Sequence, residues 1–403
     1  METNKSLPAL LALSLGYFGM GTASLAVVGL GAPMGDSLHV PDARIGLMVT
    51  VFALTFAIAA PTAPMLLARV DRKRVLLIGL GLLTLGEALC AVVPDYTTLA
   101  VARVVAALGS AVFAPAASAT GAAIVPAERR QAALATVFGG MTIAAVLGVP
   151  LSSYLGSTLG WRPALFGVAV LTALSFVLVA VLVPPVAGGE RPTAAAYRQA
   201  LRTPAAMSTV LTTLLFMAAQ FTVYGIASTF LTDRFGVGST MVSATLLAFG
   251  VIGVIGNASG PRIVTRIGGV RTITLSVAGM GIAFVLLLLA PHARAGVALF
   301  VAWAFFSQVY QAPQQGRLVA LLPEQPALIL ALNASALYLG MSLGSTIGSA
   351  LLPDLGARPI PAFGLVLVAL AGAAHAASAR RAAAPPAAAV EAGPRNATTP
   401  QNS

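Results

Sequence analysis

Two charged residues, Glu87 and Arg103, lie inside hydrophobic stretches, whereas almost every other charge falls between such stretches. A charged side chain at the centre of a membrane helix costs about 2.5–3.5 kcal/mol on insertion scales. Ionisable groups retained at such a cost most often handle protons or substrates, and the main alternative is a buried structural ion pair. These two residues therefore predict either proton or substrate handling, or a static pair, within a membrane.

The segments that carry the two charges are predicted to be membrane helices. Hydrophobic residues make up 58% of the 403 residues and charged residues 9%, against about 25% charged in a soluble domain. About 20 residues of helix span a hydrocarbon core of roughly 30 Å, and lipid cannot satisfy an open backbone. We expect an all-α integral membrane protein with twelve transmembrane helices, at residues 8–33, 44–67, 75–93, 97–118, 131–155, 162–184, 205–231, 239–260, 271–291, 294–316, 327–351 and 359–379.

The basic residues indicate the topology of these helices. The net charge of +11 would at first suggest a nucleic-acid partner, but most Lys and Arg residues fall in alternate loops, on the side of the N-terminus. Such a bias follows the positive-inside rule. We therefore expect a multi-pass protein of the cell membrane with both termini in the cytoplasm, and no nucleic-acid binding. Cys90 is the single cysteine, which excludes an intramolecular disulfide and a cysteine-based metal site.

The chain is predicted to consist of two pseudo-symmetric six-helix halves. A polar break gives an N-terminal half at 1–184, a cytoplasmic central loop at 185–204, a C-terminal half at 205–381 and a disordered cytoplasmic tail at 382–403. The basic segment 64–74 after the second hydrophobic stretch is echoed at 261–271 after the eighth. Repetition at corresponding positions is typical of transporters built from repeated halves.

Several motifs resemble those of the major facilitator superfamily over roughly residues 8–380, and within it the twelve-span drug:proton antiporters and sugar-efflux-like exporters. The segment 64–74 resembles the family's loop between spans two and three, and Gly148 and Pro150 resemble its fifth-span exporter signature, with the proline displaced by one residue. Gly160-Trp161-Arg162 is also similar to exporters of this group. The resemblance implies a role in conformational change for Arg69, Arg72, Lys73, Gly148, Pro150 and Arg266.

The chain departs from the family at three acidic positions. Ala68 and Thr265 stand where the two copies of the loop have an Asp that is thought to latch the conformational states. Ser24 stands where the first span of the exporters often has Glu. A carboxylate latch of the usual form is therefore in doubt, and few acids remain that could carry a proton.

The resemblance assigns Arg103 to proton coupling. The pattern Leu99-x-x-x-Arg103-x-x-x-x-x-Gly109 is similar to the family's fourth-span motif, whose arginine is linked to that role. Its guanidinium does not deprotonate, so it would tune a neighbouring acid or hold an anionic substrate. Glu87 is the predicted proton carrier, because it is the one acid within a predicted span, and Asp36 is the alternative. Span three is generally peripheral in this fold, which leaves open whether Glu87 reaches Arg103.

Polar residues in spans seven, ten and eleven are the candidates for substrate binding. A polar stripe facing lipid would be expensive, so these side chains should face the bundle interior or its inner aqueous end. The alternative is hydrogen bonding between helices, which contributes about 0.6 kcal/mol per contact. The candidates are Gln220, Tyr224, Gln308, Tyr310, Gln311, Gln314, Gln315, Asn333 and Tyr338.

Glycines recur every four residues in span eleven, at Gly340, Gly344 and Gly348. A helix face made of small residues lets a neighbouring backbone approach closely. The spacing therefore predicts close packing, and also a smooth face along which the two halves could slide.

Together these features predict a secondary transporter that exports a small organic compound in exchange for protons, by rocking of two halves around a central site. The expected partners are a small-molecule substrate, protons and the lipid bilayer, with the protein a monomer. The chain has no phosphate-binding loop of the ATPase type, and no cofactor, metal site or enzymatic activity is expected. The alternatives are a sugar or metabolite exporter or uniporter without proton coupling, and a transport-inactive sensor or scaffold.

Overall fold

The computed structural model describes residues 6–67, 69–126, 129–188 and 194–383, and every regular element in these ranges is a helix. Twelve of the helical segments are long and apolar enough to cross a membrane, and each overlaps one of the twelve predicted stretches. The predicted twelve-helix membrane fold is thus confirmed. The predicted tail falls almost wholly on 384–403, outside the described residues.

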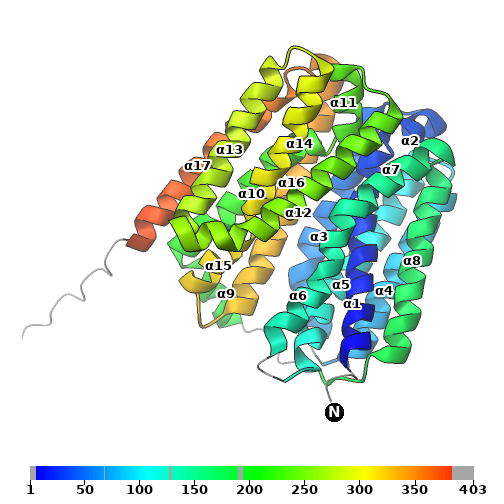
Figure 1. The fold of residues 1–403 in the computed structure, drawn as a ribbon. Helices are drawn as coiled ribbons and strands as arrows, with labels where there is room; N and C mark the ends of the chain where they lie inside the picture. The colour runs from blue at the N-terminus through cyan, green and yellow to red at the C-terminus, as the bar shows by residue number, and fades with distance from the viewer. Residues whose placement is uncertain (1–5, 68, 127–128, 189–193, 384–403) are drawn as a thin grey trace, which may run out of the picture.

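The helices form two groups that lie side by side in Figure 1. The N-terminal half contains α1 (Ser6–Leu25), η2 (Ala26–Gly29), α2 (Gly31–Leu38), α3 (Asp42–Leu67), α4 (Arg72–Val92), α5 (Tyr96–Ala123), α6 (Arg130–Ile143), η4 (Ala144–Gly148), α7 (Val149–Thr158) and α8 (Trp161–Leu182). A short helix in the central loop follows, α9 (Ala194–Leu201). The C-terminal half contains α10 (Pro204–Tyr224), α11 (Ala227–Phe235), α12 (Ser239–Ile267), α13 (Gly269–Leu289), α14 (Ala293–Val309), α15 (Gln311–Leu321), α16 (Pro326–Leu355) and α17 (Ile360–Ala383).

The first span of each half ends in the same way. In the N-terminal half α1 stops at Leu25 and the chain continues through η2 into the short helix α2. In the C-terminal half α10 stops at Tyr224 and the chain continues into the short helix α11. Both breaks lie at the end of the bundle away from Ser6 (Figure 1). We call the end at which α1 begins the N-terminal face and the other end the opposite face.

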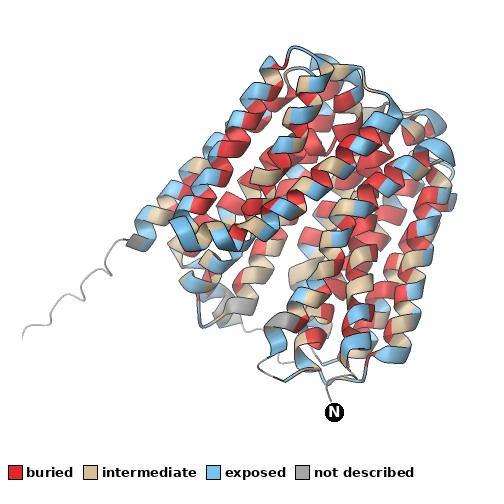
Figure 2. Cartoon of the chain, viewed as in Figure 1, coloured by how far each residue is buried: buried red, intermediate tan, exposed pale blue. Residues whose placement is uncertain are grey.

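Burial follows the arrangement expected for a bundle in lipid. Buried residues line the contacts between helices, and exposed residues follow the outer sides (Figure 2). Many of the exposed residues are large and apolar, among them Ile58, Val101 and Val181. Such residues suit the hydrocarbon of a membrane, whose tails are as apolar as they are.

The glycines of span eleven pack within their own half. A Cβ atom at Gly340, Gly344 or Gly348 would meet backbone carbonyl oxygens of α10, those of Leu214, Ala218 and Thr222 respectively. The predicted close packing is therefore correct, and the predicted sliding face between the halves is wrong. The glycine face of span eleven packs on span seven of the same half and is not exposed to the other half.

The two halves contact each other through α3 against α16 and through η4 and α7 against α12. Thr50 Oγ1 of α3 lies 3.1 Å from Thr346 Oγ1 of α16. Ser153 Oγ of α7 lies 2.8 Å from Ser243 Oγ of α12. All four residues lie toward the opposite-face ends of their helices, so these contacts join the halves near that face.

Candidate functional site

The two intramembrane charges form a buried ion pair. Arg103 Nη1 lies 3.3 Å from Glu87 Oε1, and both side chains are 0% exposed. The peripheral position expected of span three does not keep the two side chains apart. Within the described residues, Glu87 Oε2 and Arg103 Nε have no hydrogen-bond partner. The pair is therefore joined through one carboxylate oxygen only, and the other oxygen remains open to a proton.

Close packing of α4 on α5 brings the pair together. Gly79 and Gly86 of α4 and Gly109 of α5 lie where an added Cβ atom would meet the backbone of the other helix. The helices also form a tight hairpin, in which Asp95 Oδ1 accepts the backbone N–H groups of Thr97 and Thr98 at 2.9 and 3.0 Å and starts α5. The bond from the Thr98 N–H, reinforced by Thr97, holds the pKa of Asp95 below its ordinary value.

Arg103 also holds the end of α1. Its Nη1 donates to the carbonyl oxygen of Ala23 at 2.6 Å, and its Nη2 donates to that of Ser24 at 3.1 Å. The last carbonyl groups of a helix lack partners within it, and a cation is favourable there. Ser24, which replaces the family's usual acid, turns its own hydroxyl to the Gly21 carbonyl oxygen at 2.8 Å. Arg103 thus fixes the point at which the first span breaks into η2.

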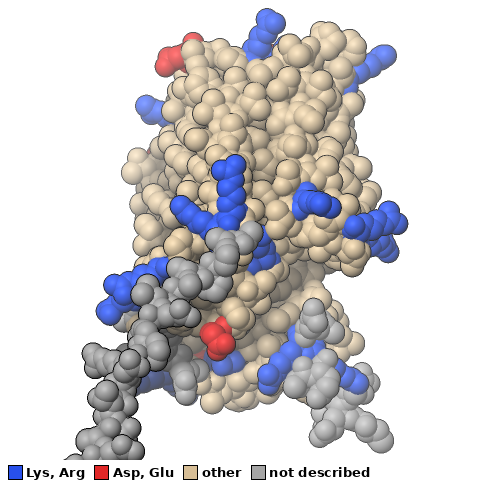
Figure 3. Space-filling model, turned by 90° about the vertical axis from the view of Figure 1, so that its left-hand side faces the viewer, with Lys and Arg blue, Asp and Glu red and all other residues tan. Residues whose placement is uncertain are grey.

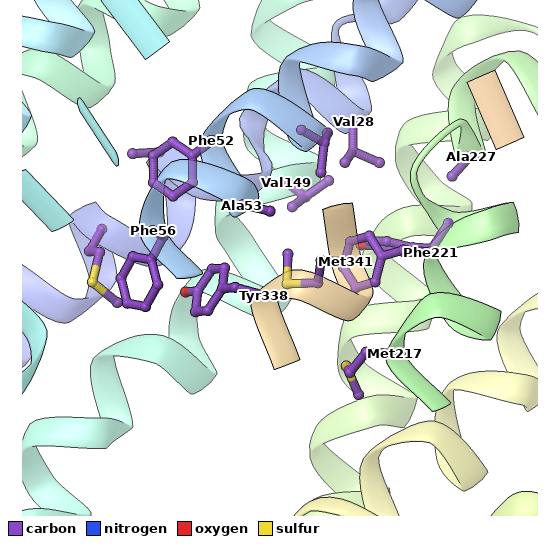
Figure 4. Packing of buried hydrophobic residues seen from close by; sticks show 14 of the residues in the cluster. Val28, Phe52, Ala53, Phe56, Val149, Met217, Phe221, Ala227, Tyr338 and Met341 are labelled. Carbon is purple, nitrogen blue, oxygen red and sulfur yellow. The ribbon is translucent and has the colours of Figure 1, made fainter. Parts of the chain in front are cut away.

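An aromatic series connects the ion pair to the other half. The Arg103 guanidinium lies over the Phe52 ring of α3, 4.5 Å from its centroid. Phe56 lies one turn further along the same helix and stacks on Tyr338 of α16, with ring centroids 3.8 Å apart. Figure 4 shows these rings between the two halves, with Met341 beside Tyr338. The predicted substrate residue Tyr338 therefore lies at the contact between the halves, against the same helix α3 whose Phe52 packs against Arg103.

Asn333 belongs to a neutral network centred on Thr213. Thr213 Oγ1 donates to Asn333 Oδ1 at 2.6 Å and lies 3.1 Å from the Tyr310 hydroxyl. Gln314 Nε2 donates to Thr213 Oγ1 at 3.0 Å and to the Thr209 carbonyl oxygen at 2.7 Å. All of these residues are buried. The network ties spans seven, ten and eleven together toward the N-terminal face.

The residues of this network could be only partly anticipated. Asn333, Tyr310 and Gln314 are among the polar residues predicted to line the substrate cavity, whereas Thr213 lies outside that set. A signal for Thr213 exists in the sequence, because Thr209 and Thr213 are four residues apart and so share a helix face. Threonine in a membrane helix is commonly satisfied by its own backbone, and for that reason the spacing alone does not identify a network.

Two of the predicted substrate residues, Gln220 and Tyr224, are buried within the C-terminal half. Tyr224 packs among Phe249, Phe300 and Trp303, with ring centroids 4.8 to 6.5 Å away. Gln220 is also buried, and its Oε1 atom has no partner among the described residues. Tyr224 thus contributes to aromatic packing, while Gln220 keeps one unsatisfied acceptor.

The other three predicted glutamines of span ten, Gln308, Gln311 and Gln315, lie on both sides of a break in the helix. Gln308 is in α14, whereas Gln311 and Gln315 are in α15. Gln308 and Gln311 are partly buried and Gln315 is exposed. Their side-chain amides make no hydrogen bond within the described part of the chain, unlike that of Gln314. These amides are consequently available to a ligand.

The basic residues of the repeated loops differ in their contacts. Arg72 donates from Nη1 to the Ala119 carbonyl oxygen at 2.9 Å and so ties α4 to α5 at the N-terminal face. Lys73 is partly buried, whereas Arg69 and its counterpart Arg266 are exposed. Neither Arg69 nor Arg266 forms an ion pair with a described residue.

The fifth-span motif forms an irregular turn at the contact between the halves. η4 is a π-helical turn that ends at Gly148, and Pro150 follows in the first turn of α7. Proline lacks a backbone N–H and disrupts the regular ladder, which accounts for the altered turn before it. A Cβ atom at Gly148 would meet Thr22 of α1, so glycine is required by this close approach. Asp36, the alternative proton carrier, is exposed on α2, outside the first span.

Comparison with known proteins identifies relatives of the whole bundle. A family model described as Major Facilitator Superfamily matches residues 11–345. Inner membrane transport protein YdhP of Escherichia coli (strain K12) is 31% identical over 372 residues, which cover 90% of this chain and 93% of that protein. A probable sugar efflux transporter of Mannheimia succiniciproducens is 26% identical over 361 residues, with coverages of 89% and 91%.

Two solved structures share the fold. A bacterial homolog of the human lysosomal transporter Spinster, in an inward-facing and unoccupied conformation, has a TM-score of 0.77 at 16% identity and covers 94% of this chain and 98% of its own. The E. coli xylose transporter XylE, in a partially occluded inward open conformation, has a TM-score of 0.73 at 15% identity, with coverages of 92% and 97%.

Proposed function

This chain belongs to the Major Facilitator Superfamily of membrane transporters, and from that premise we propose that it exports a small organic compound in exchange for protons. The observation that carries the proposal is the one-sided contact of the two halves. Hydrogen bonds between Thr50 and Thr346 and between Ser153 and Ser243 join the halves near the opposite face. Rocking of the halves about a central site would break these contacts and close the other end.

The orientation of the bundle in the membrane determines which side of the transporter this conformation would close. The positive-inside bias of the loops assigns the N-terminal face to the cytoplasm. Contacts near the opposite face then close the outer side, which is the state that accepts a substrate from the cytoplasm. The relative from Mannheimia succiniciproducens is named as a probable sugar efflux transporter, and export is the direction that we propose here.

The substrate would bind between the halves, below the Phe56–Tyr338 stack. Gln308, Gln311 and Gln315 offer amides without internal partners, and α16 carries Asn333 and Tyr338, the latter a ring of the stack. Amides and hydroxyl groups bind neutral polar molecules through paired donors and acceptors. We therefore propose an uncharged or weakly polar substrate.

Glu87 is the proton carrier in this proposal. A proton on Glu87 Oε2 would neutralise the partner of Arg103, which also holds α1 and packs on Phe52. Loss of the ion pair would free Arg103 to move, and with it the break in the first span. Moving one charge through 100 mV supplies about 2.3 kcal/mol, which is sufficient to drive a substantial substrate gradient.

Reconstitution in proteoliposomes tests this proposal. We would measure the flux of a panel of neutral sugars and of one fluorescent drug, with and without an imposed pH gradient. Glu87→Gln should abolish gradient-driven accumulation while retaining downhill flux, and Asp36→Asn should behave as the unmodified protein. Flux that is indifferent to the pH gradient in the unmodified protein would contradict antiport.

A uniporter is the second candidate, and complete burial of the ion pair favours it. With both side chains 0% exposed, the pair is equally suited to a static role in the packing of α4 on α5. In a uniporter, Glu87→Gln and the unmodified protein would show the same downhill flux and neither would respond to pH.

A further inference from the structure

An apolar groove runs along the outer side of the C-terminal half, between α13 and α17. Its volume is about 730 Å³. Figure 1 shows these two helices at the edge of the bundle, on the side away from the N-terminal half. The groove is therefore separate from the contact between the halves. It shares no lining residue with the candidate site described above.

The groove has the length of a lipid tail. It extends along α13 from Val270 to Leu286, which at 1.5 Å per residue is about 24 Å of a hydrocarbon core of roughly 30 Å. Small residues at its floor, Gly281 and Gly372 among them, keep it open. His375 closes the floor at the N-terminal face, where its Nε2 lies 3.1 Å from both the Val270 carbonyl oxygen and Thr274 Oγ1.

A basic residue without a partner stands at one end of this groove. Arg380 lines it at the N-terminal face. Neither Arg380 nor the nearby Arg271, at the start of α13, has a hydrogen bond or ion pair with any residue that the structure describes. By contrast Arg381 Nη1 donates to Ser208 Oγ at 2.6 Å, and Arg317 Nη2 to Ser378 Oγ at 3.0 Å.

The surroundings of Arg380 favour an anion from outside the protein. The sequences of α13 and α17 contain no Asp or Glu. Figure 3 looks onto this side of the molecule and shows Lys and Arg from its middle downward, with an acidic side chain below them, and a tan area without charge between them and the charges at the top edge. Basic residues at a membrane surface attract anionic lipid headgroups. A long apolar groove with a basic residue at its end matches the acyl chain and the charged headgroup of an anionic phospholipid.

We propose that this groove holds one anionic phospholipid, with an acyl chain along α13 and α17 and the phosphate at Arg380. Arg271 contributes positive potential beside the headgroup. A second copy of the chain is a poorer occupant, because a two-fold interface through this groove would bring two uncompensated sets of arginines together. The lipid would serve as a fixed wedge between spans nine and twelve.

Native mass spectrometry tests the proposal on the full chain purified from membranes and exposed to phosphatidylglycerol or phosphatidylcholine. One tightly retained phosphatidylglycerol is expected, and no retained phosphatidylcholine. Arg380→Ala should lower phosphatidylglycerol occupancy about fivefold, the change expected for one basic residue near an anionic surface. Arg294→Ala, an exposed arginine at the opposite face, is the matched control and should retain the lipid.

A second variant tests the channel itself. A Cβ atom at Gly372 would meet only Val277, at 3.6 Å, so Gly372→Leu fills the groove without displacing backbone and should also lower occupancy. Equal retention of the two lipids, or full retention by both variants, would overturn the proposal. A dimer in the unmodified protein that Gly372→Leu dissociates would overturn it in favour of a second copy.

Discussion

The two halves hold their first and fourth spans together in opposite ways. In the N-terminal half the tie is charged, from Arg103 of span four to the carbonyl groups of Ala23 and Ser24 in span one. In the C-terminal half it is neutral, from Gln314 of span ten to Thr209 and Thr213 in span seven. The charged tie lies toward the opposite face and the neutral one toward the N-terminal face.

This difference separates a switchable contact from a fixed one. The charged tie depends on one carboxylate, and a single proton on Glu87 would change its energetics. The neutral tie is shared among several hydroxyl and amide groups, none of which titrates near neutral pH. If the protein is the antiporter that we propose, the N-terminal half would carry the coupling step, while the C-terminal half would provide a rigid frame for the substrate.

The largest expected effect comes from removing the acid of the charged tie. Glu87→Ala leaves Arg103 buried without a counter-ion, which typically destabilises a protein by about 3–5 kcal/mol. We expect a matching fall in thermal unfolding temperature in detergent. The double variant Glu87→Ala with Arg103→Met should regain part of that stability, because no charge is left buried, and should not transport. A stability within 1 kcal/mol of the unmodified protein for Glu87→Ala alone would show that the pair does not hold the half together.

The neutral tie should be less sensitive to a single substitution. Thr213→Val keeps the shape and removes three hydrogen-bond contacts, which at about 0.6 kcal/mol each amounts to about 2 kcal/mol. Thr212 is the matched control, because its hydroxyl group bonds only within its own helix, to the Ser208 carbonyl oxygen at 2.8 Å. Unfolding measurements should show a clear loss for Thr213→Val and little for Thr212→Val. Equal losses would mean that the network contributes no more than a local bond.

The aromatic series tests whether the two ties communicate. Phe56→Ala removes the stack on Tyr338, a contact of about 0.5–1.5 kcal/mol beyond the area it buries. The opposite face should open more often, so a thiol introduced as Ser349→Cys in a Cys90→Ala background should react faster with a polar reagent. Tyr338→Phe keeps the stack and should leave the rate unchanged. An unchanged labelling rate in Phe56→Ala would mean that the aromatic series does not connect the ion pair to the closure of the halves.

The fold was predictable from the sequence because the membrane imposes it. Long apolar runs must become helices, and each of the twelve runs did. The break at Leu25 was not predictable, because the residues there are apolar and a tertiary contact, the cap that Arg103 provides, accompanies the end of the helix. The break at Tyr310 has a signal in the sequence, since Pro313 has no N–H to donate to the Val309 carbonyl group four residues earlier.

The candidate site was predictable in its residue types and only partly in its geometry. The insertion cost singled out Glu87 and Arg103, but their contact depends on the packing of Gly86 and Gly109 at the α4–α5 interface. Likewise the choice between Gln314, which is bonded, and Gln311, which is not, depends on the exact rotation of α15 after the break. Spacing along one helix does not contain that information.

The smallest expected effect concerns the hydrogen bond between Ser153 and Ser243, which joins the halves apart from both ties. Each hydroxyl group is buried and the oxygen atoms are 2.8 Å apart, so the bond should contribute about 0.6 kcal/mol to closure of the opposite face. Ser153→Ala, Ser243→Ala and the double variant form a cycle, read out by labelling at Ser349→Cys. If closure is set by this bond alone, the double variant should match either single one. Additive effects would instead mean that each serine acts through its own neighbours, and the closure would then depend chiefly on the aromatic series that leads back to Arg103.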